Sequence, residues 1–453
     1  MKKTAKLSLF AITWPLFIEI MLYMLMGNAD TLMLSQYSDN SVAAVGVSNQ
    51  ILSMVIVMFG FIATGTAILV AQNLGAKRDD QAREVSVVSI GTNLVFGLLL
   101  SAGVFIFSEP LLRLMDLPPE LFDEANAYLR IVGGFSFIQS LIMTVGSIVR
   151  SYGYTRDIMY VTIGMNILNV IGNYIFIFGT FGIPVLGVEG VAISTSVSRI
   201  IGLIAAFYVM MRRIPGTLPM SMLFRFPKNH LKNLLNIGIP SAGEHLSYNG
   251  SQMLITYFIA TLGTQALTTK VYTQNVMMFV FLFSIAISQG TQILIGHMVG
   301  AKEIDNAYKR ALKSLKLAIM ISIAAAGVVS IFAKDLLGIF TENMSIIEVG
   351  TTLILLTIIL EPGRSFNLVL ISSLRAAGDV KFPVYMGILS MWGVSVTLSY
   401  FLGIYLELGL VGIWIAFIAD EWLRGLFMLW RWKSKVWVKK SFVPETKPVY
   451  AEK

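Results

Sequence analysis

Twelve apolar runs, each long enough to cross a lipid bilayer as a helix, dominate the sequence. A helix needs about 20 residues to cross a hydrocarbon core that is ~30 Å thick. Hydrophobic residues make up 56% of the 453 residues and charged residues only 13%, against roughly 25% charged in an average soluble domain. We therefore predict an all-α integral membrane protein. The runs lie near residues 10–34, 44–72, 86–107, 126–151, 158–181, 187–211, 234–261, 268–297, 311–332, 346–376, 382–404 and 409–432.

Lysine and arginine are distributed unevenly between the two ends of these runs. If the N-terminus is cytoplasmic, the opposite side of the membrane receives only Arg113, Arg130, Lys270 and Lys334 among the 34 basic residues. By the positive-inside rule, this bias predicts a multi-pass protein of the plasma (inner) membrane with both termini in the cytoplasm. The start Met1-Lys2-Lys3 leads into the first run and does not resemble a cleavable signal peptide. The net charge of +8 therefore reflects topology, and a nucleic-acid partner is not expected.

The chain repeats itself at an offset of 225 residues. Six helices are an even number, so both halves enter the membrane from the same side. The expected fold is therefore two six-helix lobes related by a pseudo-two-fold axis along the membrane normal, as in alternating-access transporters. We place an N-lobe at 1–211, a linker at 212–233, a C-lobe at 234–432 and a tail at 433–453. The matching positions include Pro15 and Pro240, Glu19 and Glu244, Gly75-Ala76-Lys77 and Gly300-Ala301-Lys302, and Arg150 and Arg375.

Residue types exclude several kinds of site. The chain has no cysteine and only three histidines, which are scattered, so neither a metal site nor another cofactor is expected. No H-E-x-x-H, G-x-S-x-G or P-loop motif is present. The chain is therefore not expected to be an enzyme, and transport would draw its energy from an ion gradient or an external partner.

Ionisable residues inside the runs are few. A charge at the centre of a spanning helix costs about 2.5–3.5 kcal/mol, so it usually faces a partner or a cavity. Asp30, in Gly27-Asn28-Ala29-Asp30-Thr31, is either a structural carboxyl group that bonds to neighbouring helices or a group that binds and releases protons. Glu19 and Glu244 occupy equivalent places in the repeat, which indicates a structural role. Other candidates are Asp420 with Arg424, an i,i+4 pair, and Arg199 and Arg364, which either pair with acids elsewhere or extend to the membrane surface.

Asn166, Asn169 and Asn173 share one face of the fifth run, because they are three and four residues apart. Such a row of amides either forms hydrogen bonds between helices or lines a pocket that contains water. Methionine is abundant, with 24 residues, and includes the pair Met277-Met278. Methionine surfaces adapt to many ligand shapes, although lipid contact or core filling explains any single methionine better.

Several of these segments, in this order, resemble the MATE (multidrug and toxic compound extrusion) family of transporters. The resemblance covers about residues 10–432. It implies export of cationic and amphipathic compounds driven by H⁺ or Na⁺. The matching segments are Pro15, Asp30-Thr31, Ala43-Ala44-Val45-Gly46, Gly75-Ala76-Lys77, Asn169 to Ile177, and Gly187 to Thr195.

The resemblance also implies roles for particular residues. Asp30 matches the family's first-helix acid, which acts in proton coupling, while Asn169 and Thr195 match supporting polar positions and Asn173 replaces a second acid found in many relatives. In the C-lobe, Tyr248 and Arg364 stand where the sodium-type branch has acids, with Glu244 one turn before Tyr248. These departures argue against Na⁺ and favour a DinF-like branch coupled to H⁺. The supporting polar set comprises Asn28, Asn166, Asn169, Asn173 and Thr195, and the C-lobe candidates are Glu244, Tyr248 and Arg364.

The sequence thus predicts a monomeric secondary antiporter, surrounded by membrane lipids, that exchanges small amphipathic cations for H⁺ through Asp30. Three alternatives remain open. The first is a flippase for lipids or lipid-linked oligosaccharides, because such flippases share the same two-lobe architecture. The others are a Na⁺-coupled drug antiporter and a membrane scaffold without transport activity. A flippase would favour a cavity with several cations that hold phosphate groups.

Overall fold

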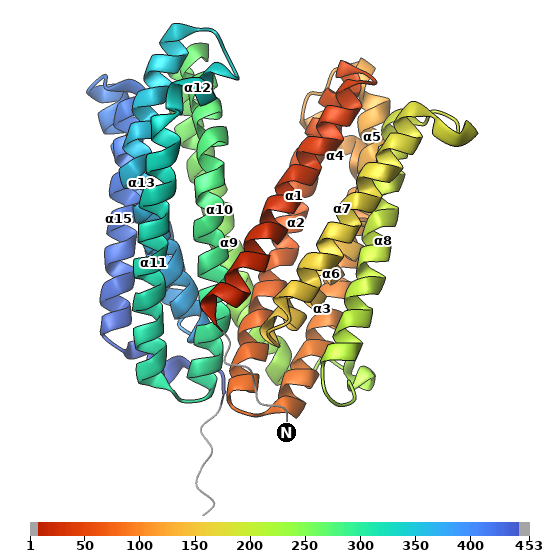
Figure 1. Cartoon of the computed structure of the whole chain (residues 1–453), viewed down its shortest axis with the longest axis vertical. Helices are drawn as coiled ribbons and strands as arrows, with labels where there is room; N and C mark the ends of the chain where they lie inside the picture. The colour runs from red at the N-terminus through yellow and green to blue at the C-terminus, as the bar shows by residue number, and fades with distance from the viewer. Residues whose placement is uncertain (1–7, 444–453) are drawn as a thin grey trace, which may run out of the picture. The chain divides into compact units, whose positions relative to one another are not determined.

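The computed structural model describes residues 8–443 (Figure 1). Within this range the secondary structure is helical and contains no β-strand. The basic residues Lys2, Lys3 and Lys6 at the start of the chain, and Lys447 and Lys453 at its end, lie outside the described residues. The Met1-Lys2-Lys3 segment, from which we predict that the chain has no cleavable signal peptide, also lies outside the described residues.

Each of the twelve predicted runs corresponds to a helical segment. Short helices α4 (Ser108–Leu114) and α12 (Ala333–Gly338) and the 3₁₀ turns η1 (Thr180–Gly182), η2 (Met220–Met222) and η5 (Val436–Lys440) connect or follow the long ones. The long segments are α1 (Leu9–Ser35), α2 (Asp39–Gly75), α3 (Asp79–Ile106), α5 (Pro119–Gly134) with α6 (Ser136–Ser151), α7 (Thr155–Phe178), α8 (Gly187–Arg213), α9 (Lys228–Thr261), α10 (Thr264–Gly300), α11 (Ile304–Ile331), α13 (Met344–Ala376), α14 (Lys381–Ser390) with the π-helical turns η3 (Met391–Val396) and η4 (Ser399–Tyr405), and α15 (Gly409–Lys433).

Not all of these segments are apolar enough to qualify as membrane spans on composition alone. Among the described residues nine helices qualify, and ten if α5 and α6, which meet at a 41° bend, form one span. The helices α9 and α15 are not among them. Both carry polar or charged side chains in mid-helix, for example Glu244 in α9 and Asp420 in α15, and these line a cavity described below. The protein is therefore an all-helical membrane protein with polar positions concentrated in a few helices.

The chain divides into two compact units. Unit 1 comprises the described part of residues 1–70 together with residues 80–238, and unit 2 comprises 71–79 and the described part of 239–453. Each unit has its own buried apolar core, for example around Phe59 and Leu129 in unit 1 and around Leu370 and Trp432 in unit 2. The predicted linker at 212–233 contains η2 and the first residues of α9. The lobe boundaries stay predictions.

Two glycines that match in the repeat mark a close approach of two helix ends within unit 2. A Cβ atom on Gly75, at the end of α2, would lie 2.0 Å from the carbonyl oxygen of His297, and one on Gly300, at the end of α10, would lie 1.9 Å from that of Gln72. The residues Lys77 and Lys302, two positions further on, both adopt positive φ, at 57° and 61°. The repeated Gly-Ala-Lys segment therefore supplies both sides of one close crossing, and it ends each helix in the same left-handed turn.

Replacement of Gly300 by alanine tests this crossing. We expect Gly300→Ala to destabilise the protein by about 3 kcal/mol or more, because the added Cβ meets backbone that cannot rotate away. The control is Gly327→Ala in α11, where a Cβ meets nothing within 4 Å. Thermal denaturation of the two purified variants is the measurement, and equal midpoints would contradict the prediction.

Candidate functional site

A polar cluster in unit 1 surrounds the carboxyl group of Asp30. This residue lies in α1 and is 6% exposed. The Asn173 amide nitrogen Nδ2 donates to Asp30 Oδ1 at 2.5 Å and lies 3.4 Å from Asn169 Oδ1. Asn169 Nδ2 in turn donates to Thr195 Oγ1 at 3.1 Å. The cluster thus joins α1, α7 and α8, and it unites four of the residues singled out in the sequence.

Close packing of α7 against α8 holds this cluster in place. A Cβ atom on Gly172 would lie 2.2 Å from Ser194 Oγ, so a larger residue at this position of α7 would displace the Ser194 side chain. The Ser194 hydroxyl donates to the backbone carbonyl of Asn169 at 2.9 Å. The backbone of α7 is therefore tied to α8 at the turn from which Asn169 and Asn173 extend toward Asp30.

Two residues of the predicted polar set lie outside the cluster. Asn166 is buried, but its Nδ2 donates to the Thr162 carbonyl oxygen in its own helix at 2.9 Å. Asn28 lies exposed on α1 and has no recorded hydrogen bond to Asp30. The three-asparagine stripe therefore contributes two of its members to the site.

Asp30 differs from every other buried acid among the described residues. Six acids are buried there, and five of them pair with an arginine. Asp30 has no ion pair and relies on the Asn173 amide, with Arg199 near enough to interact with its charge but not to bond it. The pairs are Glu19–Arg150 at 2.7 Å, Glu361–Arg364 at 2.6 Å, Asp379–Arg431 at 2.7 Å, Asp420–Arg424 at 2.7 Å, and Glu244–Arg375.

The surroundings of Asp30 suit either protonation state of its carboxyl group. The ionised carboxylate accepts the hydrogen bond from Asn173 Nδ2. The amide oxygen Oδ1 of the same residue is buried and has no hydrogen-bond partner. A protonated Asp30 would become a donor, and that amide oxygen is an acceptor close by. The Arg199 Nε atom is also buried without a hydrogen-bond partner.

Unit 2 contains a cavity of about 690 Å³ into which the C-lobe candidates Glu244, Tyr248 and Arg364 all extend. Its walls come from α9, α10, α13, η3 and α15. Apolar and aromatic side chains cover much of the surface, including Met277, Met278, Phe281, Trp414 and Phe417. The methionine pair therefore belongs to a cavity wall: Met277 is 4% exposed and Met278 is 42% exposed.

A network of charges crosses this cavity. Arg364 contacts Glu361 and lies 3.8 Å from Glu421. Arg424 contacts Asp420 and Glu421, at 2.7 Å and 3.0 Å. Four carboxylates and three arginines line the cavity in all, so its formal charge is not positive. The carboxylates are Glu244, Glu361, Asp420 and Glu421, and the arginines are Arg364, Arg375 and Arg424.

Glu361 is the residue of this network that the sequence did not single out. Its side chain is fully buried, one of its oxygens contacts Arg364, and the other, Oε2, has no hydrogen-bond partner. The signal was present as Glu361-Pro362 inside an apolar run, one turn before Arg364. Asp420 and Arg424 form the expected i,i+4 pair, and Arg364 pairs with acids instead of extending to the membrane surface.

The repeated acids Glu19 and Glu244 form equivalent ion pairs. Glu19 in α1 contacts Arg150 at the end of α6, and Glu244 in α9 contacts Arg375 at the end of α13. Both pairs join residues 131 positions apart in the chain. Each unit thus carries the same buried link, as the structural role expected from the sequence requires. No group of three or more His, Asp or Glu side chains suited to a metal ion occurs between residues 8 and 443.

Comparisons with known proteins agree on one family. The family model described as MatE matches residues 15–175 and 240–401, and the two matches begin in the 225-residue register of the repeat. An uncharacterised transporter, YisQ of Bacillus subtilis, is 59% identical over 434 residues, covering 96% of this chain and 95% of that relative. The probable multidrug resistance protein NorM of Thermotoga maritima is 26% identical, with coverage of 96% and 93%.

Solved structures show the same fold. A MOP superfamily transporter from Pyrococcus furiosus, described as having a binding pocket of reversed polarity, has a TM-score of 0.86 at 21% identity, with 96% of each chain covered. A MATE crystal structure in a bent conformation also scores 0.86 at 21% identity and covers 95% of this chain and 96% of that one.

The Glu19–Arg150 pair supplies a test of its structural role. We expect Arg150→Met to destabilise the protein by about 3–5 kcal/mol, because the Glu19 carboxylate is left buried without a partner. The double variant Glu19→Leu/Arg150→Met removes both charges and should recover most of that loss. Thermal denaturation of four purified proteins, the wild type, both single variants and the double variant, completes a double-mutant cycle. Additive effects of the single changes Glu19→Leu and Arg150→Met would contradict the prediction.

Proposed function

The chain belongs to the MatE family of secondary transporters, and we propose from this premise that it exports cationic, amphipathic compounds in exchange for protons, with Asp30 as the proton-binding group. The observation that carries the proposal is the bonding of Asp30. It is the buried acid of residues 8–443 that lacks an arginine in ion-pair contact, although Arg199 lies near enough to interact with its charge. A carboxyl group that is hydrogen-bonded to a neutral amide is not locked in its ionised form by an ion pair.

Protonation of Asp30 changes the hydrogen bonds that its carboxyl group can form. The ionised carboxylate accepts from the Asn173 amide, whereas the protonated form would donate, and the amide group would have to turn or α1 would have to shift. Coupling then requires only that the two states of the protein differ in their affinity for the exported compound. Protons taken up from outside would favour release, and loss of the proton to the cytoplasm would restore binding.

The lining of the cavity in unit 2 supports the proposal that the exported compounds are cationic and amphipathic. Methionine and aromatic side chains such as Met278, Phe281 and Phe417 adapt to ligands of different shapes. The unpartnered Oε2 atom of Glu361 offers a buried negative group to a cation. A flexible apolar wall with an acidic group suits compounds that are both apolar and positively charged.

The same cavity counts against export of lipid phosphates. A site for phosphate groups needs free cations, and each of the three arginines of the cavity already contacts a carboxylate: Arg364 contacts Glu361, Arg375 contacts Glu244, and Arg424 contacts Asp420. The Na⁺ alternative is disfavoured by Tyr248 and Arg364, which stand where the sodium-type branch carries acids. We propose a monomer in the plasma membrane, with both termini in the cytoplasm.

Replacement of the proposed coupling residue is the direct functional test. In proteoliposomes with a H⁺ gradient, we expect Asp30→Asn to reduce efflux of a cationic dye by at least about tenfold, because asparagine does not titrate. A Na⁺ gradient alone should drive little efflux by the wild-type protein. The control Asp39→Asn makes the same change at an exposed position at the start of α2 and should leave efflux unchanged. The proposal fails if Asp30→Asn retains wild-type, proton-driven efflux.

A second test concerns the substrate cavity. We expect Glu361→Gln to weaken binding of a cationic dye by about tenfold, since a charge-assisted contact is lost, while Gln retains an oxygen for Arg364. Binding of an uncharged analogue of the dye should not change. The matched control is Glu348→Gln, an exposed position of α13 outside the cavity. Fluorescence titration of purified protein measures both affinities, and equal losses for the two dyes would contradict a role for the charge.

A further inference from the structure

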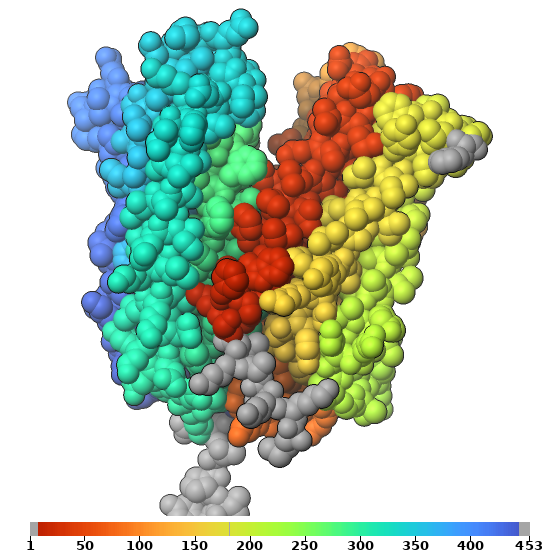
Figure 2. Space-filling model, viewed as in Figure 1, coloured from red at the N-terminus to blue at the C-terminus, as the bar shows by residue number. Residues whose placement is uncertain are grey.

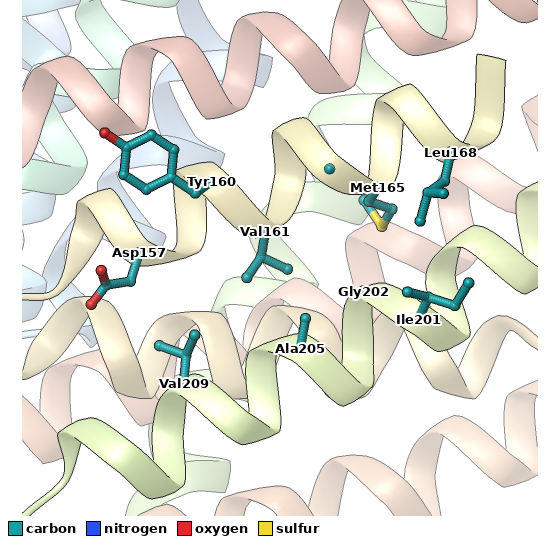
Figure 3. A pocket seen from close by; sticks show the side chains of 10 residues that line it. Asp157, Tyr160, Val161, Met165, Leu168, Ile201, Gly202, Ala205 and Val209 are labelled. Atoms are coloured by element: carbon teal, nitrogen blue, oxygen red, sulfur yellow. The ribbon is translucent and has the colours of Figure 1, made fainter. Parts of the chain in front are cut away.

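The helices α7 and α8, yellow and yellow-green, lie side by side in unit 1 (Figure 2). An apolar groove of about 360 Å³ lies between them (Figure 3). Side chains from both helices point into it, and its walls are almost entirely apolar, apart from Asp157 and Tyr160 near one end. The groove is separate from the Asp30 cluster, and none of the cluster residues lines it. Its wall residues include Val161, Gly164, Met165, Leu168, Ile201, Gly202, Ala205 and Val209.

Small residues create the groove. A Cβ atom on Gly164 would meet no atom within 4 Å, so glycine there leaves open space. Across the groove, Gly202 and Ala205 of α8 are also small, and Met165 lies against Gly202. The surrounding surface is apolar and exposed, with Ile201 at 43%. In a membrane-spanning protein, such a surface faces acyl chains.

The groove ends at a group of arginines. Asp157 lies at that end, where the Arg213 guanidinium contacts it through two hydrogen bonds of 2.7 Å and 3.1 Å. Arg212, the preceding residue of α8, is exposed, lies 3.4 Å from the Tyr208 hydroxyl and has no ion pair among residues 8–443. Arg156, beside Asp157 in the first turn of α7, instead lies over the Trp14 ring of α1. Arg212 and Arg213 together with Asp157 leave this end with an excess of one positive charge.

We propose that this groove binds an anionic phospholipid, with one acyl chain between α7 and α8 and the headgroup phosphate at Arg212. The apolar walls match an acyl chain in shape and polarity, and the excess positive charge is confined to one end, as a lipid with a charged headgroup requires. The sequence places these arginines at the cytoplasmic surface, where anionic lipids attract basic residues. The proposal does not depend on the transported compound or on Asp30.

Lipid binding to the purified full-length protein tests the proposal. Native mass spectrometry with added phosphatidylglycerol, and separately with phosphatidylcholine, would measure the affinity of the first bound lipid. We expect tighter binding of phosphatidylglycerol. Arg212→Gln should reduce that affinity by about fivefold, the equivalent of about 1 kcal/mol. This variant keeps the Arg213–Asp157 pair and thus the local structure.

Filling the groove separates acyl-chain binding from headgroup attraction. We expect Gly164→Leu to reduce binding of both lipids, since leucine occupies the open space beside Gly164. The control Gly327→Leu adds the same side chain to α11, where there is also open space, and should change neither affinity. Thermal denaturation confirms that both variants are folded.

Three results would overturn the proposal. One is unchanged phosphatidylglycerol affinity in both Gly164→Leu and Arg212→Gln. Another is equal affinity of the wild-type protein for phosphatidylglycerol and phosphatidylcholine. The third is a dimer that dissociates in Gly164→Leu, which would identify the occupant of the groove as a second copy of the chain.

Discussion

The cost of burying a charge away from water organises this structure. Acids that lie inside the helix bundle are stable there only with a partner. Five of the six buried acids among residues 8–443 have an arginine as that partner. Such pairs fix the helices that carry them, as Glu19 and Arg150 fix α1 to α6. Asp30 is hydrogen-bonded to the neutral amide of Asn173 and has no arginine in contact, with Arg199 acting on its charge only from a distance.

The internal repeat separates structural residues from functional ones. The Glu19–Arg150 pair of unit 1 and the Glu244–Arg375 pair of unit 2 occupy equivalent positions of the repeat. The position equivalent to Asp30 is Ile255, which is fully buried in the apolar core of unit 2. Unit 2 instead carries the Glu361 and Arg364 network, on the wall of its cavity. The two units thus share a frame and differ in their polar sites, which is consistent with proton binding in one and substrate binding in the other.

Features encoded by local pattern were predictable from the sequence, and those that depend on packing were not. Apolar runs gave the twelve helical segments, and the i,i+4 spacing gave the Asp420–Arg424 pair. Asn173, which bonds Asp30, is 143 residues away in the sequence, so no local pattern links the two residues. Helical spacing placed Asn169 and Asn173 on one face, and only the family resemblance pointed to Thr195. Glu361 was missed because an acid before a proline in an apolar run carries no periodic signal. Met277 and Met278 could be assigned to a cavity wall only once α9, α13 and α15 were in place.

The central claim is that Asp30 changes its protonation state when the exported compound binds. Infrared difference spectroscopy of the protein, with and without a bound cationic dye, detects the carbonyl stretch of a protonated carboxylic acid directly. The account predicts that dye binding removes one such band in the wild-type protein and that the Asp30→Asn variant lacks this change. An identical difference band in Asp30→Asn, or no carboxylic acid band in the wild-type protein, would contradict it.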